Sequence, residues 1–281
     1  MSKNNFLCGI VTYNPNIDRL CENIYAISKQ ISNIIIYDNG SDNINEIEKI
    51  TKDMKYRLIK NDVNNGIASA LKYIMDVAIR ENNDWVLLLD QDSVVQSGLI
   101  AHYTSFICNK NVGMMTCNII DRNFNEHDKQ IDDSNYNYIE KCITSGSFTR
   151  VEAYKKTSGY DKYLFIDKVD FDICYSIQKE GYQIIQVNYN GLLHEIGHGR
   201  NVNFFGNRVI YNHPAWRVYY MARNSIYLAK KYSDLNLSLN LIKSEIGRII
   251  LIIFFEENKH EKILAFLRGI RDGFLNINFN T

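Results

Sequence analysis

An acidic pair lies directly after an apolar run and has the spacing of a metal-binding turn. Asp90 and Asp92 flank Gln91 and follow residues 85–89 (WVLLL). Carboxylates at positions i and i+2 of a turn can converge on one hard divalent cation, and that cation can hold a diphosphate. The alternative is a solvated acidic turn. The strand-like run before the pair favours the metal site.

A second acidic cluster, FIDKVDFD at residues 165–172, contains three carboxylates. If a helix begins near Lys168, Asp170 lies in its first turn, where the helix dipole stabilises an anion. A carboxylate held there can act as a general base if it reaches an acceptor hydroxyl. The alternative is that the cluster only supplies charge to the helix terminus.

Residues 194–198 (HEIGH) match the H-E-x-x-H pattern of zinc metallopeptidases. That pattern requires a helix, so that His194 and His198 share one face beside Glu195. Three glycines surround the segment, and the residues before it are typical of a strand. A zinc peptidase is therefore disfavoured. His194 alone, at the end of a strand, is a candidate metal ligand, and His198 is equally explained as a loop histidine.

The elements that must position these residues alternate between strand and helix. Compact apolar runs predict strands at residues 6–13, 33–37 and 85–89, and a weaker pattern predicts one at 56–60. Apolar residues at helical spacing predict helices between them, the clearest covering 20–31 and 67–78. This order implies parallel pairing with right-handed crossovers and a sheet covered on both faces. Asn14, Asp38 and Asp90 each follow a strand, where ligands of such sheets bind.

The turn Asp38-Asn39-Gly40-Ser41 after the second strand has two interpretations. In the functional one, Asp38 accepts a hydrogen bond from a pyrimidine N–H. In the other, it is an ordinary turn in which Ser41 caps the next helix.

The pattern changes after residue 121. Residues 121–137 are polar and predict a surface insertion, followed by a helix to about residue 180 and a strand at 183–187. Helices are expected at 214–232, 235–256 and 260–275.

Composition excludes several classes of protein. Apolar residues make up 46% and charged residues 23% of the 281 residues, which excludes wholesale disorder. Lys plus Arg and Asp plus Glu both total 32, and this zero net charge argues against a nucleic-acid partner. The six cysteines form no C-x-x-C pair, so they indicate free thiols in a reducing compartment.

Other signals are missing from the sequence. It has no P-loop, no dinucleotide-binding G-x-G-x-x-G after the first strand and no nucleophile elbow. We see no signal peptide, and the longest apolar run, residues 249–255, is shorter than the ~18 residues of a membrane span. We therefore expect a cytoplasmic protein.

The helices expected after residue 213 combine apolar and basic side chains. We expect them to pack on the catalytic domain and on a second copy of the chain, as a homodimer. The alternative is peripheral contact with a membrane surface, as amphipathic basic helices make.

Taken together, these segments resemble family 2 glycosyltransferases of the GT-A fold, and within them the bacterial L-rhamnosyltransferases. The matching segments run in order along residues 6–225: VTYNP at 11–15, IYDNGS at 36–41, NGIA at 65–68, WVLLLDQDS at 85–93, SG at 145–146, FIDKVD at 165–170, LHE at 193–195 and RN at 223–224. An ordered series is far more specific than any single motif. D-Q-D-S with F-I-D-x-V-D is the combination that indicates rhamnosyl transfer.

The resemblance implies an α/β architecture of the GT-A fold, a mostly parallel sheet flanked by helices as in nucleotide-diphospho-sugar transferases, with a C-terminal helical extension. We expect a catalytic domain at 1–212, with a donor half at about 1–120 and an acceptor half at about 121–212. The extension then covers 213–281.

The resemblance also implies roles for individual residues. The nucleotide sugar would contact Thr12, Tyr13, Asn14, Asp38, Asn39, Asn65, Gly66, Asp90, Gln91 and Asp92. Ser145, Gly146 and Asp167 would line the sugar and acceptor side. Asp92 would bind Mg²⁺ or Mn²⁺ directly, Asp90 would bind it through water or lie against the ribose, and His194 would be a further ligand. Asp170 would be the catalytic base.

The implied reaction is inverting transfer of a sugar from a nucleotide-sugar donor, preferably dTDP-L-rhamnose, to a hydroxyl of a glycan or lipid-linked oligosaccharide. Bacterial surface polysaccharide such as O-antigen or capsule is the expected product, made in the cytoplasm or at the inner face of the cell membrane. UDP-galactofuranose, UDP-galactose and UDP-glucose are alternative donors. A zinc peptidase and a catalytically silent sugar-nucleotide-binding or scaffold protein are the competing classes.

Overall fold

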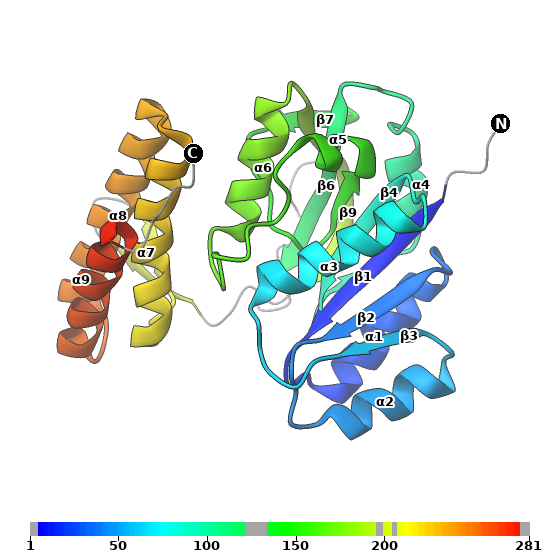
Figure 1. Cartoon of the computed structure of the whole chain (residues 1–281), viewed down its shortest axis with the longest axis horizontal. Helices are drawn as coiled ribbons and strands as arrows, with labels where there is room; N and C mark the ends of the chain where they lie inside the picture. The colour runs from blue at the N-terminus through cyan, green and yellow to red at the C-terminus, as the bar shows by residue number, and fades with distance from the viewer. Residues whose placement is uncertain (1–4, 122–133, 195–198, 204–206, 276–281) are drawn as a thin grey trace. The chain divides into compact units, whose positions relative to one another are not determined.

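The computed structural model describes residues 5–121, 134–194, 199–203 and 207–275. The chain divides into two compact units (Figure 1). The first contains residues 1–163 and 169–195, and the second contains residues 164–168 and 196–281.

The first unit is built on one mixed sheet. Its described strands are β1 (Phe6–Thr12), β2 (Ile34–Asp38), β3 (Arg57–Lys60), β4 (Trp85–Asp90), β5 (Val94–Val95), β6 (Val112–Asp121), β7 (Tyr136–Ile139), β8 (Ser147–Arg150) and β9 (Gln183–His194). Their order is β3-β2-β1-β4-β8-β6-β9-β5, and β7 pairs with β9. The pairs among β1 to β4 are parallel, which confirms the order expected from alternating strands and helices. Beyond β4 the sheet is mixed, because β8 runs antiparallel to both β4 and β6.

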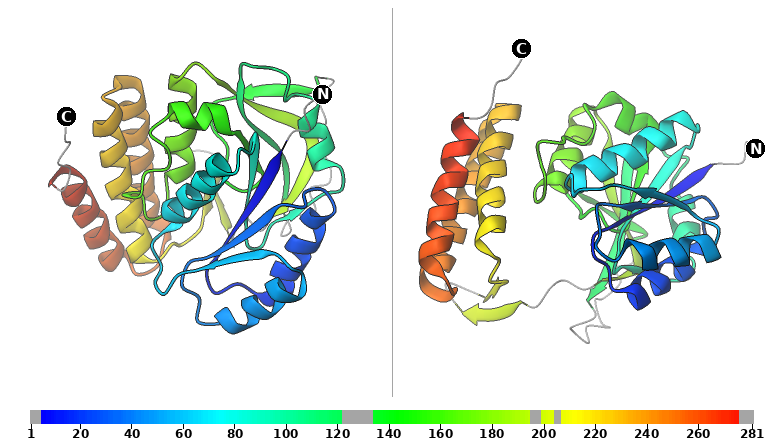
Figure 2. Two further views of the ribbon diagram at one scale, coloured as in Figure 1. Left: turned by 45° about the vertical axis from the view of Figure 1, so that its right-hand side comes forward. Right: turned by 60° about the horizontal axis from the view of Figure 1, so that its bottom comes forward.

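Helices cover both faces of this sheet (Figure 2). They are α1 (Ile17–Ser28), α2 (Ile44–Asp53), α3 (Ile67–Arg80), α4 (Leu99–Thr104), α5 (Val151–Lys156) and α6 (Val169–Lys179). Alternate side chains of β1 point to opposite faces. Cys8 and Ile10 pack in one core cluster with Leu20 of α1. On the other face, Gly9 lets α3 approach closely, since a Cβ there would lie 2.5 Å from a side-chain carbon of Ile74.

Two segments differ from their sequence-based expectation. The strand expected at 183–187 continues to His194, because β9 pairs with β6 along its whole length through a register shift near Asn118. Within the polar segment expected at 121–137, β7 already begins at Tyr136. Residues 122–133 lie outside the described residues.

The second unit is mainly helical. It contains α7 (Ala215–Tyr232), α8 (Leu235–Phe255), α9 (Lys259–Leu275) and the antiparallel pair β10 (Arg200–Asn203) and β11 (Asn207–Ile210). The three helices confirm the expected ranges to within one residue. Asp234 caps α8 by accepting a 2.9 Å hydrogen bond from the Leu237 N–H. Among the described residues, no helix is long and apolar enough to cross a membrane.

Glycines allow α7 and α9 to pack closely. A Cβ at Gly269 would lie 2.4 Å from the Tyr219 carbonyl oxygen, and one at Gly273 would lie 2.8 Å from the Arg223 carbonyl oxygen. Any larger side chain at either position would push the two helices apart. The outer faces of α8 and α9 expose large apolar side chains, among them Leu235, Ile246, Phe254, Leu267 and Phe274.

Candidate active site

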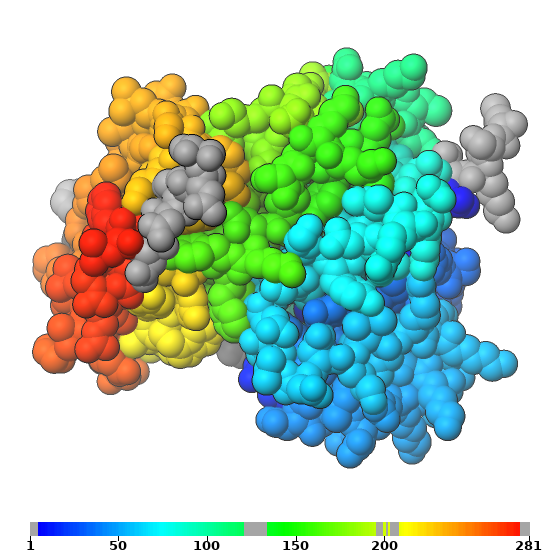
Figure 3. Space-filling view, in the orientation of Figure 1, coloured from blue at the N-terminus to red at the C-terminus, as the bar shows by residue number. Residues whose placement is uncertain are grey.

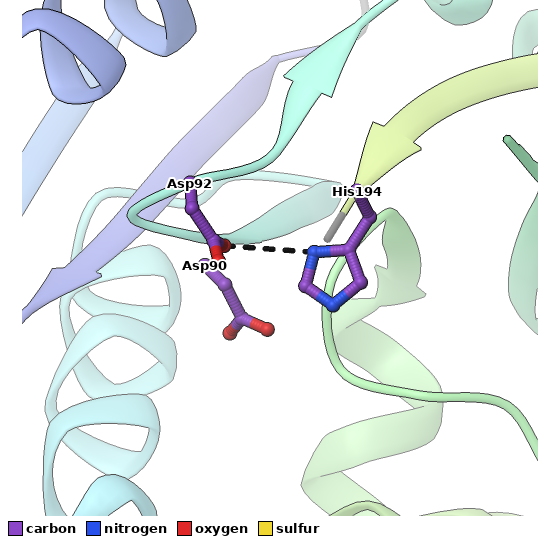
Figure 4. A group of neighbouring side chains, drawn as sticks. All are labelled: Asp90, Asp92 and His194. Carbon is purple, nitrogen blue, oxygen red and sulfur yellow. Dashed lines mark ion pairs between the residues drawn. The ribbon is translucent and has the colours of Figure 1, made fainter. Parts of the chain in front are cut away.

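Two carboxylates and one imidazole converge at the carboxyl ends of β4 and β9 (Figure 4). Asp90 ends β4, Asp92 lies in the turn that follows, and His194 ends β9. Each offers one ligand atom, and these atoms lie within 4.8 Å of one another. Carboxylate oxygens suit Mg²⁺ and Mn²⁺, and imidazole nitrogen also binds divalent metals. We call Asp90, Asp92 and His194 the metal group. Its oxygen and nitrogen donors are the ones that the sequence analysis expected.

A short antiparallel pairing brings the metal group together. Val94 and Val95 of β5 pair with Leu193 and Leu192 of β9, so the next position along the ladder places Ser93 opposite His194. The Asp92 Oδ1 atom then lies 3.5 Å from His194 Nδ1.

Two buried hydroxyl groups, those of Ser93 and Ser145, form hydrogen bonds to the metal group. The Ser145 Oγ accepts a 3.0 Å hydrogen bond from the Asp90 backbone N–H and donates a 2.7 Å bond to Ser93 Oγ. Ser93 Oγ in turn shares a 2.8 Å hydrogen bond with His194 Nδ1. A histidine that binds a metal through Nε2 commonly donates its Nδ1–H to a neighbouring oxygen, and Ser93 occupies that place. The sequence analysis assigned no role to Ser93, although it lies inside the D-Q-D-S motif.

The pKa of Asp90 is raised to about 6. Burial is the main cause, because it disfavours the charged carboxylate. His194 lowers this pKa, whereas the negative charges of Asp92 and Asp170 raise it further. Asp170 is therefore close enough to the metal group for its charge to act there.

This pKa predicts how metal binding depends on pH. A metal binds the deprotonated carboxylate, so proton and metal compete for Asp90. We expect the affinity for Mn²⁺ to fall as the pH drops below the Asp90 pKa of about 6, by at most about tenfold per pH unit. The same proton stabilises the metal-free fold, because a folded-state pKa above the ordinary value of about 3.9 favours folding as pH falls through it.

Calorimetric titration with Mn²⁺ and melting of the metal-free protein, both at several pH values, would test this prediction. The Asp90→Asn variant should lack the part of each pH dependence that Asp90 causes. Equal Mn²⁺ affinities at pH 5 and pH 7.5 in the unsubstituted protein would contradict it.

The turn after β2 is organised around a buried carboxylate. Asp38 is fully buried, and its Oδ1 accepts hydrogen bonds from Thr12 Oγ1 at 2.9 Å and from the Ser41 hydroxyl. Its Oδ2 accepts from the backbone N–H groups of Gly40 at 3.1 Å and Ser41 at 2.9 Å. These four bonds use all the lone-pair sites of a carboxylate. The helix α2 begins after Asn43, so Ser41 is not its N-cap, contrary to the second interpretation of this turn.

The loops after β1, β2 and β4 are bonded to one another. The Tyr13 N–H donates a 2.8 Å hydrogen bond to Gln91 Oε1. The Asn14 N–H donates to Ser41 Oγ at 2.8 Å, and Asn14 Oδ1 accepts from the Asp42 N–H at 2.7 Å. Tyr13 is 48% exposed, so its ring is available to a ligand.

Asparagines link the second of these loops to the start of α3. Asn39 Nδ2 donates a 2.8 Å bond to Asn64 Oδ1, and Asn39 Oδ1 accepts a 3.0 Å bond from the Asn65 N–H. Gly66 adopts a φ of +83° and donates its N–H to Asn64 Oδ1 at 2.9 Å. Figure 3 shows the surface formed by α2, the loop at 61–66 and α3, coloured blue to cyan.

The remaining predicted residues lie on three elements. Gly146 adopts a φ of +80°, and its carbonyl accepts a 2.7 Å bond from the Tyr103 hydroxyl. Asp170 is half-buried in the first turn of α6, as expected, and its Oδ1 accepts a 2.8 Å bond from the Phe171 N–H. Asp167 belongs to the second unit, where its carboxylate pairs with Arg217.

The zinc-peptidase alternative is wrong in its geometry. His194 ends a strand, so the helix that the H-E-x-x-H pattern requires does not contain it. Glu195 and His198 lie outside the described residues.

The family model for glycosyl transferase family 2 matches residues 8–168. The dTDP-rhamnosyl transferase RfbF of Shigella flexneri is 26% identical over 286 residues, covering 95% of this chain and 96% of RfbF.

Solved structures show a similar fold. The crystal structure of Staphylococcus aureus TarS 1-349 has a TM-score of 0.62 at 12% identity, covering 96% of this chain and 80% of that one. A structure of GalNAc-T7 with UDP, GalNAc and Mn²⁺ has a TM-score of 0.56 at 14% identity, covering 69% of this chain. The chain spans only 44% of the GalNAc-T7 structure. At these identities the likeness shows the fold alone, a mixed α/β sheet flanked by helices with a C-terminal helical part.

Proposed function

The chain belongs to glycosyl transferase family 2 and is a glycosyltransferase, and from that premise we propose that it transfers L-rhamnose from dTDP-L-rhamnose to a hydroxyl group of a glycan or lipid-linked oligosaccharide. The observation that carries the choice of sugar is the similarity to a dTDP-rhamnosyl transferase along 95% of the chain. The metal group supports the use of a diphosphate-bearing donor.

The metal group fits Mg²⁺ or Mn²⁺. Asp92 and His194 would hold the ion directly, and Asp90 would bind it through water or lie against the ribose. When bound, the ion acts as a Lewis acid that neutralises the growing charge of the diphosphate leaving group. Ser93 and Ser145 keep His194 and the Asp90 backbone in place through their hydrogen bonds.

Asp170 is the general base of this proposal. Its place in the first turn of α6 favours the carboxylate form, and its charge reaches Asp90. Asp170 takes the proton of the acceptor hydroxyl as that oxygen attacks the anomeric carbon. The attack comes from the side opposite the diphosphate, so the anomeric configuration is inverted.

The nucleotide-sugar site lies along the joined loops after β1, β2 and β4. The residues that we assign to it are Thr12, Tyr13, Asn14, Asp38, Asn39, Asn65, Gly66, Asp90, Gln91 and Asp92. Asp38 already accepts four hydrogen bonds, so a pyrimidine N–H must share or replace one of them. Ser145, Gly146 and Asp167 are assigned to the sugar and acceptor side.

A thermal-shift panel of nucleotides and nucleotide sugars, each with and without Mn²⁺, tests the donor. A ligand that binds only the native state stabilises it and so raises the melting temperature. The free energy of unfolding increases by about 2.7 kcal/mol when the ligand concentration is a hundred times its Kd. We expect dTDP and dTDP-rhamnose to give the largest shifts and to require metal. Larger shifts with UDP-galactofuranose, UDP-galactose or UDP-glucose would keep the family and change the sugar. No shift with any nucleotide would favour a protein that has lost transfer activity.

The wider setting follows from the same proposal. We assign residues 1–212 to the catalytic domain and 213–281 to a helical extension. The product would be a bacterial surface polysaccharide such as O-antigen or capsule, made in the cytoplasm or at the inner face of the cell membrane. The exposed apolar residues of α8 and α9 would contact a second copy of the chain or a membrane surface.

A further inference from the structure

The turn at residues 90–93 is held by a buried side chain of α1. Asn23 is fully buried, and its Nδ2 donates a 2.7 Å hydrogen bond to the Asp90 carbonyl oxygen. The backbone bond that the turn itself makes to this oxygen, from the Ser93 N–H, is long at 3.3 Å. The bond from Asn23 is therefore the better of the two that fix the carbonyl group.

The Asp90 backbone is thus fixed on both sides by side chains. Its N–H donates to Ser145 Oγ at 3.0 Å, and its carbonyl group accepts from Asn23. The two peptide planes of Asp90 determine in which direction its carboxylate leaves the chain. They also determine how the turn continues to Asp92 and Ser93. Asn23, Asp90 and Ser145 all belong to the first unit.

The other polar atom of the Asn23 amide lowers the stability of the fold. Asn23 Oδ1 is buried and accepts no hydrogen bond from any described residue. The amide cannot turn this oxygen toward Asp90, because a carbonyl oxygen only accepts. A buried acceptor without a partner destabilises the folded state, which is why most buried polar atoms are paired. Leucine has a similar shape without this defect, so stability alone does not explain an asparagine at position 23.

The position of α1 does not depend on this bond. The apolar residues of the helix lie in the main core cluster of the sheet. Two helical turns after Asn23, Gln30 Nε2 donates a 2.9 Å bond to the Gln96 carbonyl oxygen, and Gln30 Oε1 accepts a 3.1 Å bond from the Ile100 N–H. Loss of the Asn23 contact should therefore leave the helix in place and release only the Asp90 carbonyl group.

We propose that Asn23 is a positioning residue for the metal group: it fixes the Asp90 carbonyl group, and with it the turn that sets the Asp92 carboxylate against Asp90 and His194 (Figure 4). This inference rests on the proposed function, in which these three residues hold Mg²⁺ or Mn²⁺. Asn23 acts through the backbone and does not contact the ion. Its unpartnered oxygen is the loss of stability that accompanies this contact.

Asn23→Leu tests the proposal, because leucine has nearly the shape of asparagine and forms no side-chain hydrogen bond. We expect the Kd for Mn²⁺, measured by calorimetric titration without nucleotide, to rise about ten- to a hundredfold, as when residues that orient metal ligands are replaced. The melting temperature of the metal-free protein should change little, because the lost bond is offset by removal of the buried oxygen. A merely structural asparagine would give the opposite result, a lower melting temperature and an unchanged Kd.

Asn43→Leu is the matched control. Asn43 Nδ2 donates a 3.0 Å bond to the Pro15 carbonyl oxygen, and its buried Oδ1 also has no partner among the described residues. The control therefore removes the same kind of bond and the same kind of oxygen away from the metal group. Its Kd for Mn²⁺ should change less than about twofold. An unchanged Kd in Asn23→Leu, or equal increases in the two leucine variants, would overturn the proposal.

Asp92→Ala distinguishes the positioning role from the proposed function. If Asn23→Leu does not fold, Asn23→Ala removes the same bond with a smaller side chain and takes its place. Weaker Mn²⁺ binding in Asp92→Ala, together with an unchanged Kd in the Asn23 variant, would reject only the positioning role. If the unsubstituted protein binds no Mn²⁺, or if Asp92→Ala binds it equally well, the metal group itself is wrong and the positioning role is rejected with it.

Discussion

Replacing Asp170 with asparagine should lower kcat by about 10²- to 10⁴-fold, the contribution that a positioned general base normally makes. Asparagine keeps the size and polarity of the side chain and cannot accept the proton of the acceptor hydroxyl. Since Asp170 is not assigned to the donor site, the Kd for dTDP-rhamnose in the presence of Mn²⁺ should change less than about threefold. Steady-state kinetics and calorimetric titration would measure the two quantities.

The same variant has a second readout that does not depend on activity. The negative charge of Asp170 contributes to the raised pKa of Asp90. Its removal should lower that pKa, so the loss of Mn²⁺ affinity on acidification should begin at a lower pH. Asp76→Asn is a matched control, because Asp76 is a carboxylate on the outer side of α3 that pairs with Lys72. Near-normal turnover of Asp170→Asn, with the protein folded, would mean that another group takes the proton.

The first half of the sheet was predictable from the sequence because its signals are local. The strands β1, β2 and β4 are short apolar runs, and the helices between the strands repeat their apolar residues at helical spacing, as Leu20, Ile24 and Ile27 do in α1. The alternation leads directly to parallel pairing. The C-terminal helices were predictable for a similar reason, since Pro214 and Asp234 mark two of their starts.

The geometry of the metal group was not predictable from local signals. Asp90, Asp92 and His194 were recognisable as candidate ligands, but the two-residue strand β5 that brings them together has no signature of its own. Its pairing with Leu192 and Leu193 joins residues about a hundred positions apart. The hydrogen bond between Ser93 and His194 follows from this pairing, so the supporting role of Ser93 could not be assigned before the fold was known.

The left-handed backbone conformation of Asp167 and Lys168 also could not be predicted from the sequence. A glycine at either position would have indicated a positive φ, whereas aspartate and lysine indicate nothing of the kind. The contacts of this turn come from side chains of α7, about fifty residues later in the chain. Arg223 and Asn224 were recognised as a matching motif, and only the structure shows what their side chains contact.

Replacing Asp92 with alanine should remove the metal dependence of donor binding. The Asp92 side chain is 38% exposed, so its loss leaves no buried cavity. The remaining Asp90 and His194 are too few to hold a hard cation well, because such ions bind mainly to charged oxygens. We expect kcat/KM to fall at least a hundredfold, since the ion contributes several kcal/mol and about 2.7 kcal/mol already corresponds to that factor.

The effects of the metal and of the nucleotide can be distinguished by measuring melting temperatures with each of them alone and together. In the unsubstituted protein, dTDP should raise the melting temperature much more with Mn²⁺ than without it, and a chelator should abolish the difference. In Asp92→Ala, the shift should be small and equal in both conditions, whereas Asp76→Asn should behave like the unsubstituted protein. The metal contacts the diphosphate and not the nucleobase of dTDP. A weak metal-independent shift in melting temperature should therefore remain if Thr12, Asp38 and Asn39 contact the nucleoside as proposed. An unchanged response to Mn²⁺ in Asp92→Ala would show that the ion binds elsewhere, and Asp90 and His194 would then need another explanation for their convergence.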